Sequence, residues 1–428
     1  MKQSRYSFFV KNGSKVYAYN SLSNSLAIMT NVEYDCLESF ISKKKDLPKD
    51  LEKSLLKGFF LLDDNFDEIE FIKNRQEKLK NKGEHFSLTI APTLNCNFRC
   101  IYCYEKGHQE YKFMTKETEN EIVEYIKKIS STLKSISITW YGGEPLLKQD
   151  TIDRISTNLI KIADQNGIRY SSNIVTNGYL IDEKVVLLFK KARITKCQIT
   201  LDGIKENHDK RRFTCNGDGS FDVIISNLEK YGKDLPHTVI RVNVDKTNLN
   251  AVSDLKLYFK QKGLSNLEII PAPTRTTFDC YSKDYCFSSS EYYSWEREQI
   301  KKGYDELIIK SVPSIRGNNC VANTKNGFVV DPDGDLYKCW CDIGVKNYSI
   351  GNISNIDKID EKGSPIANFD PYTDKECSKC KVLPICLGGC FHDRYHKTFK
   401  TCSPYKENIN QYIFDTAKLL QKTYKMEE

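Results

Sequence analysis

The sequence lacks any apolar run that approaches the roughly twenty residues needed to span a membrane. Its first residues, MKQSRYSFFVKNG, also lack the continuous apolar stretch of a signal peptide. No long basic block accompanies the net charge of +7 in 428 residues, which argues against nucleic acid as a partner. We therefore expect a cytoplasmic protein that binds neither membrane nor nucleic acid, with a length sufficient for two or three domains.

Cysteine, in contrast, is abundant, with 16 residues. In a reducing compartment so many thiols favour metal binding over a disulfide framework. Cys96, Cys100 and Cys103 have the spacing C-x3-C-x2-C in the run TLNCNFRCIYCYEKG. Three thiolates on one loop suit an iron–sulfur cluster with one iron open to a small molecule. Zinc is the alternative, but a structural zinc site needs four ligands, usually as two CxxC-like pairs, and no fourth cysteine lies close to this triplet in the sequence.

Strand and helix patterns alternate between residues 87 and 274. Each crossover must return along the same direction, so six βα units predict a parallel sheet and a partial (β/α)6 barrel. In such barrels the chemistry lies at the carboxyl ends of the strands. The predicted strands are Ser87–Pro92, Ser135–Tyr141, Ser172–Thr176, Lys196–Leu201, Thr238–Val244 and Leu267–Pro271, and the helices between them include Thr151–Gln165, Glu183–Ala192, Phe221–Tyr231 and Leu249–Lys262.

Polar motifs end three of these strands. The second strand ends in Gly142-Gly143-Glu144-Pro145, where two glycines allow the backbone to approach a ligand and Glu144 can accept hydrogen bonds from an ammonium group. A plain turn is the alternative, because Gly and Pro are ordinary turn residues. The third and fourth strands end in Thr176-Asn177-Gly178 and Thr200-Leu201-Asp202-Gly203. Their hydroxyl and carboxylate groups could contact a ribose.

The cysteine triplet, with Tyr102 before its last cysteine, and these strand-end motifs resemble the radical S-adenosylmethionine (SAM) superfamily. The resemblance implies a [4Fe-4S] cluster on Cys96, Cys100 and Cys103. Its open iron would chelate the amino and carboxylate groups of SAM, and reductive cleavage would release a 5′-deoxyadenosyl radical. The implied SAM contacts are Tyr102, Gly142, Gly143, Glu144, Thr176, Asn177, Thr200 and Asp202, with Thr200 in the place of a ribose-contacting serine.

Two further SAM contacts are expected after the fourth strand. The run from His208 to Arg212 resembles the family's HDxxR motif, so Arg212 is a candidate to pair with the SAM carboxylate through its bidentate fork. A solvated surface charge is the alternative for this arginine. On the fifth strand we expect Arg241 and Asn243 to point to opposite faces, so that only one of them enters the barrel. We take Asn243 as that contact.

A second group of cysteines lies in the C-terminal region. Cys377, Cys380, Cys386 and Cys390 have the spacing C-x2-C-x5-C-x3-C, with Cys320 and Cys339 before them and Cys402 behind. Seven thiolates in this arrangement suit two tetrahedral sites, either two clusters or a double zinc ribbon. The arrangement resembles the SPASM domain, an auxiliary iron–sulfur extension of radical enzymes that modify peptides and proteins. That resemblance implies a distal cluster on Cys377, Cys380, Cys386 and Cys402, and a proximal cluster on Cys320, Cys339 and Cys390. The fourth proximal ligand is undecided, with Cys280, Cys286 and Cys341 as the nearest other cysteines.

The first 85 residues predict a small α+β domain. A hairpin turns at Asn12-Gly13 between Tyr6–Val10 and Lys15–Tyr19, and helical patterns follow at Asn31–Ile41 and Pro48–Lys57. This arrangement resembles the winged-helix leader-recognition domain of ribosomal peptide maturases. Such a domain can bind a peptide as an added strand. The alternative is a structural cap on the barrel. Residues 63–85 are charged and predict a helical or flexible linker.

These observations predict a winged-helix-like domain with its linker over residues 1–85, a partial barrel over 86–305 and a cysteine-rich iron–sulfur domain over 306–428. The resemblance implies a radical SAM peptide maturase with three [4Fe-4S] clusters. It would bind a ribosomal precursor peptide through its leader, install a thioether or carbon–carbon crosslink, and take electrons from a donor such as flavodoxin or ferredoxin. One alternative is an anaerobic sulfatase-maturing enzyme, although its aspartate base is replaced here by Trp340. The other is a zinc-stabilised protein that binds nucleic acid.

Overall fold

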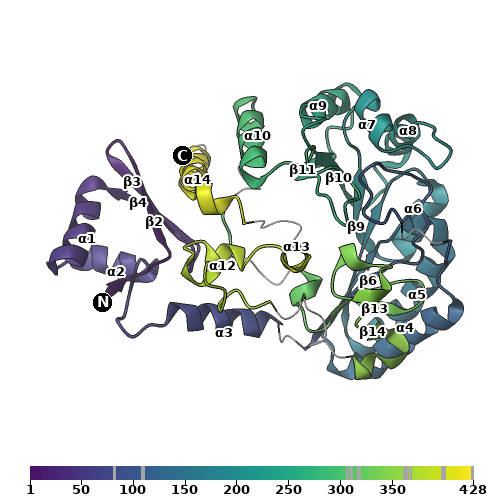
Figure 1. Ribbon diagram of the computed structural model, residues 1–428, viewed down its shortest axis with the longest axis horizontal. Coiled ribbons are helices and arrows are strands. Elements are labelled where there is room, and N and C mark those ends of the chain that lie inside the picture. Colours follow the sequence, from purple (N-terminus) through teal and green to yellow (C-terminus); the bar gives the residue numbers. More distant parts are fainter. Residues whose placement is uncertain are drawn as a thin grey trace. The chain divides into compact units, whose positions relative to one another are not determined.

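The structure is a computed structural model, and its chain packs into two units (Figure 1). The first unit comprises Met1–Lys80, Ser288–Asn319 and Phe369–Glu428, and the second comprises Asn81–Phe287 and Cys320–Asn368. The region 306–428 therefore contributes to both units, and the domain boundaries expected from the sequence stay a prediction. The structure describes residues 1–80, 83–107, 111–304, 307, 312–315, 320–359, 366, 369–396 and 402–425.

A sheet of nine strands forms the centre of the second unit. Six neighbouring strands are parallel and begin and end within about three residues of the predicted ones. The predicted mixed α/β fold with a parallel, partial barrel is thus confirmed. The strands are β6 (His85–Ile90), β7 (Ser135–Trp140), β8 (Arg169–Thr176), β9 (Ile194–Thr200), β10 (His237–Val244) and β11 (Glu268–Pro273).

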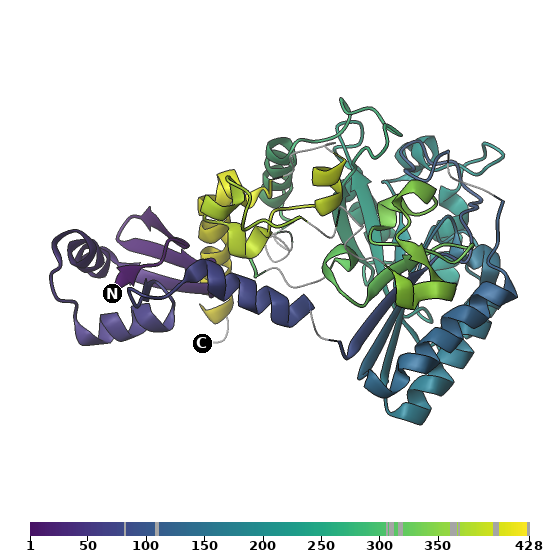
Figure 2. The same cartoon turned by 60° about the horizontal axis from the view of Figure 1, so that its bottom comes forward.

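Helices cover the outer face of this sheet (Figures 1 and 2). The strands present buried aliphatic side chains at every second position; on β10, for example, Ile240, Val242 and Val244 are fully buried. Helix caps agree with the sequence, because Thr115 and Asp182 each accept a backbone hydrogen bond at a helix start. The covering helices are α4 (Lys116–Ile129), α5 (Gln149–Asn166), α6 (Glu183–Lys191), α7 (Lys205–Arg211), α8 (Phe221–Tyr231) and α9 (Ala251–Gln261).

The C-terminal region extends the sheet beyond the six predicted strands. Strand β12 (Gly327–Val330) pairs with β6 in parallel, and β13 (Asp335–Tyr337) and β14 (Gly351–Asn352) follow antiparallel. Gly334 turns the β12–β13 hairpin with a φ of 84°. This pairing places Cys339, two residues after β13, in the same unit as the cysteine triplet that follows β6.

The N-terminal part of the first unit contains the expected hairpin and helices. Strands β2 (Ser7–Asn12), β3 (Lys15–Asn20) and β4 (Ser25–Thr30) form an antiparallel sheet, and β1 (Lys2–Gln3) pairs with β5 (Leu61–Leu62). The helices are α1 (Asn31–Lys43), α2 (Lys49–Lys57) and α3 (Glu68–Lys80), which lies in the predicted linker. A capping box between Thr30 and Glu33 starts α1.

The same unit joins this N-terminal sheet to the C-terminal cysteine segment. Tyr17 and Tyr19 of β3 pack in one apolar cluster with Val382, Ile385 and Ile413. The Ser21 hydroxyl donates a hydrogen bond to the Lys381 carbonyl over 2.8 Å. The described part of the unit also contains α10 (Ser289–Lys301) and α14 (Tyr405–Lys425), and the short helices α12 (Leu383–Cys386) and α13 (Phe391–Tyr395) carry cysteines at or beside their ends. Among the residues that the structure describes, no helix is long and apolar enough to cross a membrane.

Candidate active site

The cysteine triplet lies on the loop after β6, at the carboxyl end of the parallel sheet. Backbone bonds tie this loop to the end of α7 and the residues that follow it: Arg99 N–H donates to the Phe213 carbonyl over 2.8 Å, and Ile101 N–H donates to the Arg211 carbonyl over 3.0 Å. A β-bridge between Phe98 and Thr214 adds to these bonds. The loop between the cysteines is therefore held by the segment that carries Arg211 and Arg212.

The three thiols lie close enough to act on one another electrostatically. Burial is the largest cause of the raised pKa of Cys96, followed by the Glu144 carboxylate and the thiols of Cys100 and Cys103. Burial also raises the pKa of Cys100, and the Arg212 guanidinium opposes that shift. Without a metal these thiols keep their protons, so binding of a cation by the triplet must release protons.

The Gly-Gly-Glu-Pro turn packs against the loop that leads into the triplet. Gly143 N–H donates to the Thr93 carbonyl over 3.2 Å, and Glu144 N–H donates to the Asn95 carbonyl over 3.0 Å. A Cβ on Gly143 would lie 2.2 Å from the Asn95 oxygen. The glycines were expected to let the backbone approach a ligand. In the structure they instead allow the loop that leads into the triplet to pack closely against the turn. Their contact with SAM stays a prediction.

Glu144 is fully buried and accepts hydrogen bonds from the strand-end motif of β8. Its carboxylate receives the Thr176 hydroxyl and the Asn177 N–H, each over 2.8 Å, and the Leu146 N–H over 3.0 Å. Burial raises the pKa of Glu144, and these donors oppose the shift. Asn177 also places its side-chain nitrogen 4.0 Å from Cys96 Sγ. Predicted residues from the first three strands thus meet around one carboxylate beside the cysteine loop.

The Tyr102 hydroxyl, on the cysteine loop, joins predicted residues from the segment after β9, from β10 and from the C-terminal cap of α7. It donates to Asp202 Oδ2 over 2.6 Å, and it accepts from Arg212 Nη1 over 2.9 Å and from Asn243 Nδ2 over 3.0 Å. Asp202 is fully buried and Arg212 is 9% exposed, so Arg212 is not a solvated surface charge. Thr200, at the end of β9, is also buried.

Arg211 and Asp245 also belong to this network, although sequence reasoning did not find them. Arg211 donates from Nε to Asp202 Oδ2 over 3.2 Å and from Nη2 to Asp245 Oδ2 over 2.8 Å, and all three side chains are at most 4% exposed. The HDxxR resemblance singled out Arg212 and gave no role to the adjacent Arg211 or to Asp245. In the structure Arg211 faces two carboxylates, whereas Arg212 faces Tyr102.

The expectation that Arg241 and Asn243 point to opposite faces is wrong. Residues two apart on a strand lie on the same face, because side chains alternate with a period of two. The structure shows this directly, since Arg241 Nε donates to Asn243 Oδ1 over 2.9 Å. Both side chains therefore lie on the inner face of β10, opposite to Ile240 and Val242.

Glu105 is a buried carboxyl group that sequence reasoning missed, because nothing in its local pattern signals burial. It is 4% exposed, and within the described residues its Oε2 has no hydrogen-bond partner. Burial raises the pKa of Glu105 to about 8, and the Cys341 thiol adds to the shift. The neighbouring hydroxyls of Tyr104 and Tyr141 hydrogen-bond to each other. An uncharged carboxyl group at neutral pH thus lies two residues after Cys103.

We expect Glu105→Gln to stabilise the protein more at pH 8 than at pH 6. The folded pKa lies above the unfolded one, so ionisation costs stability as the pH rises through this window, at about 1.36 kcal/mol per unit. Glutamine removes that cost, and the gain should be about 2 kcal/mol larger at pH 8. Thermal unfolding at both pH values tests this, with the exposed Glu124→Gln as the control. An equal gain at both pH values would contradict the prediction.

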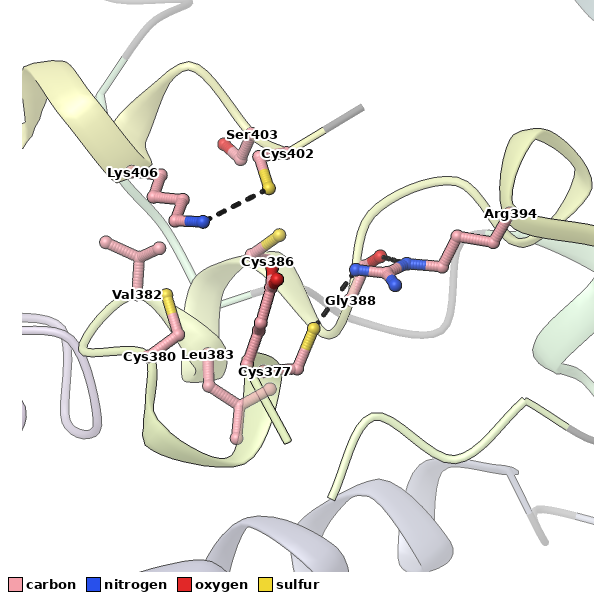
Figure 3. A pocket seen from close by; sticks show the side chains of 11 residues that line it. Cys377, Cys380, Val382, Leu383, Cys386, Gly388, Arg394, Cys402, Ser403 and Lys406 are labelled. Atoms are coloured by element: carbon pink, nitrogen blue, oxygen red, sulfur yellow. Dashed lines mark hydrogen bonds between the residues drawn. The ribbon is translucent and has the colours of Figure 1, made fainter. Parts of the chain in front are cut away.

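The four cysteines predicted for the distal cluster line one pocket (Figure 3). They are Cys377, Cys380, Cys386 and Cys402, and the pocket has an empty volume of about 370 Å³. Two cations face the thiols: Arg394 Nη2 lies 3.0 Å from Cys377 Sγ, and Lys406 Nζ lies 3.6 Å from Cys402 Sγ. Burial raises the pKa of Cys377 to about 11, and Arg394 opposes the shift. Four thiols and two cations suit an anionic metal–thiolate centre.

The three cysteines predicted for the proximal cluster are divided between the units. Cys320 and Cys339 belong to the second unit, and Cys390 belongs to the first. The thiols of Cys339 and Cys341 lie within 4.8 Å of each other. Of the other possible fourth ligands, Cys280 donates from its thiol to the Tyr102 carbonyl over 3.5 Å, and Cys286 donates to the Ser282 carbonyl over 3.6 Å. The proximal ligand set stays a prediction.

Comparison with known proteins agrees with this geometry. A sequence model of the Radical SAM superfamily matches residues 90–256, a range that contains the cysteine triplet and every predicted SAM contact. A "cysteine-type anaerobic sulfatase-maturating enzyme" of Clostridium novyi (strain NT) is 26% identical over 328 residues, 71% of this chain and 87% of the relative. This chain is a radical SAM enzyme.

Another relative of this radical SAM enzyme is named "Radical SAM cyclopropyl synthase TigE", from Paramaledivibacter caminithermalis, with 23% identity over 362 residues, 78% of this chain and 74% of the relative. Two solved structures share its fold. Histidine-tagged anSMEcpe with bound AdoMet has a TM-score of 0.63 and 21% identity, over 80% of this chain and 95% of that one. Streptococcus suis SuiB bound to precursor peptide SuiA has a TM-score of 0.53 and 16% identity, over 94% and 97%.

The residues of this chain fit the [4Fe-4S] cluster and the SAM that radical SAM enzymes use. The triplet offers three thiols, which leaves one iron of a cluster without a protein ligand. Arg212 offers an unused donor, because its Nε is buried and has no partner among the described residues. An orphaned guanidinium nitrogen is costly unless a ligand accepts from it. A carboxylate such as that of the SAM methionine would meet this need.

Proposed function

We propose that this radical SAM enzyme is a peptide maturase that binds a ribosomal precursor peptide and installs a thioether or carbon–carbon crosslink in it. The observation that carries the proposal is the second group of cysteines, with four thiols around one pocket in the unit that also contains the N-terminal sheet. A radical enzyme can use additional clusters for electron transfer, whereas zinc would serve only structure. We accordingly propose three [4Fe-4S] clusters.

The N-terminal sheet supports leader binding. Among the described residues, β2 and β4 each pair with β3 alone, so each has a free edge to which an extended peptide could add as a strand. A groove with an empty volume of about 960 Å³ adjoins β2, lined by Phe8 and Phe9 of that strand, Tyr34 of α1, and Lys381 and Ile409. Main-chain bonds would supply affinity there, and the aromatic side chains would supply specificity.

The chain's own residues would bind and orient SAM. When bound, the cluster and SAM together supply a 5′-deoxyadenosyl radical that abstracts hydrogen from the substrate. Cys96, Cys100 and Cys103 would hold the cluster, and Arg212 would bind the SAM carboxylate. The remaining proposed contacts are Tyr102, Gly142, Gly143, Glu144, Thr176, Asn177, Thr200, Asp202 and Asn243. A flavodoxin or ferredoxin would supply the electron.

The test is the intact mass of a short peptide encoded beside this chain, co-expressed with it without oxygen. We expect a loss of two hydrogens for each crosslink with the wild-type chain. The control is Cys100→Ala, which removes a cluster thiol and should leave the peptide mass unchanged. An unchanged mass with the wild-type chain, in a preparation that contains its iron, would contradict the proposal for that peptide.

A sulfatase-maturing activity is the second candidate, and the sulfatase-maturating relative of Clostridium novyi favours it. The residue after Cys339 counts against it, because Trp340 replaces the aspartate base that the resemblance leads us to expect there. Asp342 lies two positions further along, and catalytic geometry tolerates little displacement. Conversion of a sulfatase cysteine to an aldehyde, detected with a hydrazide label, would support this candidate over the first.

A further inference from the structure

One cation on the inner face of the barrel, Arg241, forms no ion pair with any described residue of the network above. Arg241 lies on β10, whose other face carries Ile240, Val242 and Val244, all fully buried. Its register partners are Thr200 on β9 and Ile270 on β11, neither of which carries a charge. Arg241 itself is only partly buried, so its side chain extends into accessible space on the inner side of the sheet.

The side chain of Arg241 is oriented by neutral groups. Its Nε donates to Asn243 Oδ1 over 2.9 Å, and Asn243 in turn donates to the Tyr102 hydroxyl over 3.0 Å. Burial raises the pKa of Tyr141, and the Arg241 guanidinium is near enough to oppose that shift. The guanidinium therefore lies between the end of β7 and the Tyr102 network, next to the groups proposed to hold SAM.

Arg241 differs from the two arginines at the end of α7, Arg211 and Arg212, in the charged groups that surround it. Arg211 pairs with Asp202 and Asp245, and Arg212 is within electrostatic reach of Cys100 and Asp202. Over the described ranges, no carboxylate lies within ion-pair distance of Arg241. The Arg241 guanidinium uses its Nε to donate to Asn243, so its two terminal nitrogens can donate to an anion. A planar carboxylate matches the geometry of these donors.

We propose that Arg241 binds a carboxylate of the substrate, so that the peptide segment taken into the barrel carries an acidic side chain. This inference rests on the proposed function, which makes the substrate a peptide. Arg241 would act as a specificity-determining residue, and Asn243 would position it. The salt link would hold the acidic residue on the inner face of β10, beside the proposed SAM contacts Tyr102 and Asn243. The peptide residue attacked would then be the acidic residue itself or a close neighbour.

The test compares two blocked peptides, Ac-Gly-Ala-Glu-Ala-Gly-NH₂ and its Gln counterpart, in which the only possible charge is the Glu side chain. Equilibrium dialysis against the holoenzyme with SAM, without reductant, measures binding apart from any chemistry. We expect the Glu peptide to bind about tenfold more tightly at low salt, in line with a charge-assisted hydrogen bond. Arg241→Gln should abolish this preference, and Arg241→Lys should retain part of it.

Arg169→Gln is the matched control, because Arg169 is an exposed arginine at the amino end of β8 and should leave the preference intact. Equal binding of the two peptides by the wild-type protein, no measurable binding of either, or a preference that survives Arg241→Gln would each overturn the inference. Because no reductant and no leader are present, these outcomes are independent of whether a precursor peptide is crosslinked. Iron content shows that each variant has folded and loaded its clusters.

Discussion

Cys100→Ala is expected to abolish the reductive cleavage of SAM and to remove about four irons from each chain. Cys100 is partly buried, and its thiol is within electrostatic reach of Cys96, Cys103 and Arg212. Alanine cannot ligate iron, and the two remaining thiols would hold a cluster with two irons unprotected. The rate of 5′-deoxyadenosine formation should fall by more than the roughly 100-fold that changes around a metal's ligands produce.

The control for this prediction is Cys215→Ala. Cys215 belongs to the segment that holds the cysteine loop, since its N–H donates to the Asn97 carbonyl over 2.8 Å, but its side chain is exposed. Its removal should change neither the iron content nor the rate. The measurements are iron content, the electron paramagnetic resonance signal of the reduced protein, and 5′-deoxyadenosine formation with dithionite. Equal iron in the two variants would count against the triplet as a cluster site.

The parallel sheet could be predicted from the sequence because its information is local. Each strand is a short apolar run between turn residues, and each helix has its own period and cap, as at Asp182 before α6. The pairing of β12 with β6 could not be predicted in this way. It joins Gly327 to Ser87, and nothing in a four-residue apolar run specifies a partner so far away in the sequence.

The candidate site shows the same division between local and distant information. The cysteine spacing and the strand-end motifs are local patterns. In the structure two of these motifs meet, because Thr176 and Asn177 both donate hydrogen bonds to the Glu144 carboxylate. Burial is a property of the tertiary structure, so the raised pKa of Glu105 left no mark on the sequence. The mistaken placement of Arg241 and Asn243 had another origin: the period of two, applied correctly, puts both on one face.

The two arginines at the end of α7 show why a motif alone does not assign a role. Arg211 is the last residue of α7 and Arg212 is its C-cap, so their side chains point in different directions. Arg211 meets the buried carboxylates of Asp202 and Asp245, which satisfy its charge within the protein. Arg212 keeps a buried Nε without a partner in the part of the chain that the structure describes. The unsatisfied donor therefore supports the assignment of Arg212 to a ligand, which the sequence pattern could only suggest.

Gly143→Ala is expected to destabilise the protein by about 3 kcal/mol or more and to displace the cysteine loop. A Cβ at this position would lie 2.2 Å from the Asn95 oxygen and 2.5 Å from the Leu94 oxygen. Both are backbone atoms, so no side-chain rotation can relieve the overlap. Asn95 immediately precedes Cys96, and its carbonyl also accepts the Glu144 N–H. Any relief must therefore move the first cysteine of the triplet.

Gly167→Ala separates this steric effect from the general cost of replacing glycine. Gly167 ends α5 with a φ of 64°, and a Cβ there would meet nothing within 4 Å. Its replacement should cost only the left-handed backbone strain of about 1 kcal/mol, with cluster content unchanged. Urea unfolding and iron content distinguish the two variants. If Gly143→Ala were as stable and as rich in iron as Gly167→Ala, the turn would not be what holds the cysteine loop. Loss of iron from Gly143→Ala alone would show that this turn acts on the cluster through the protein backbone, before any contact with SAM.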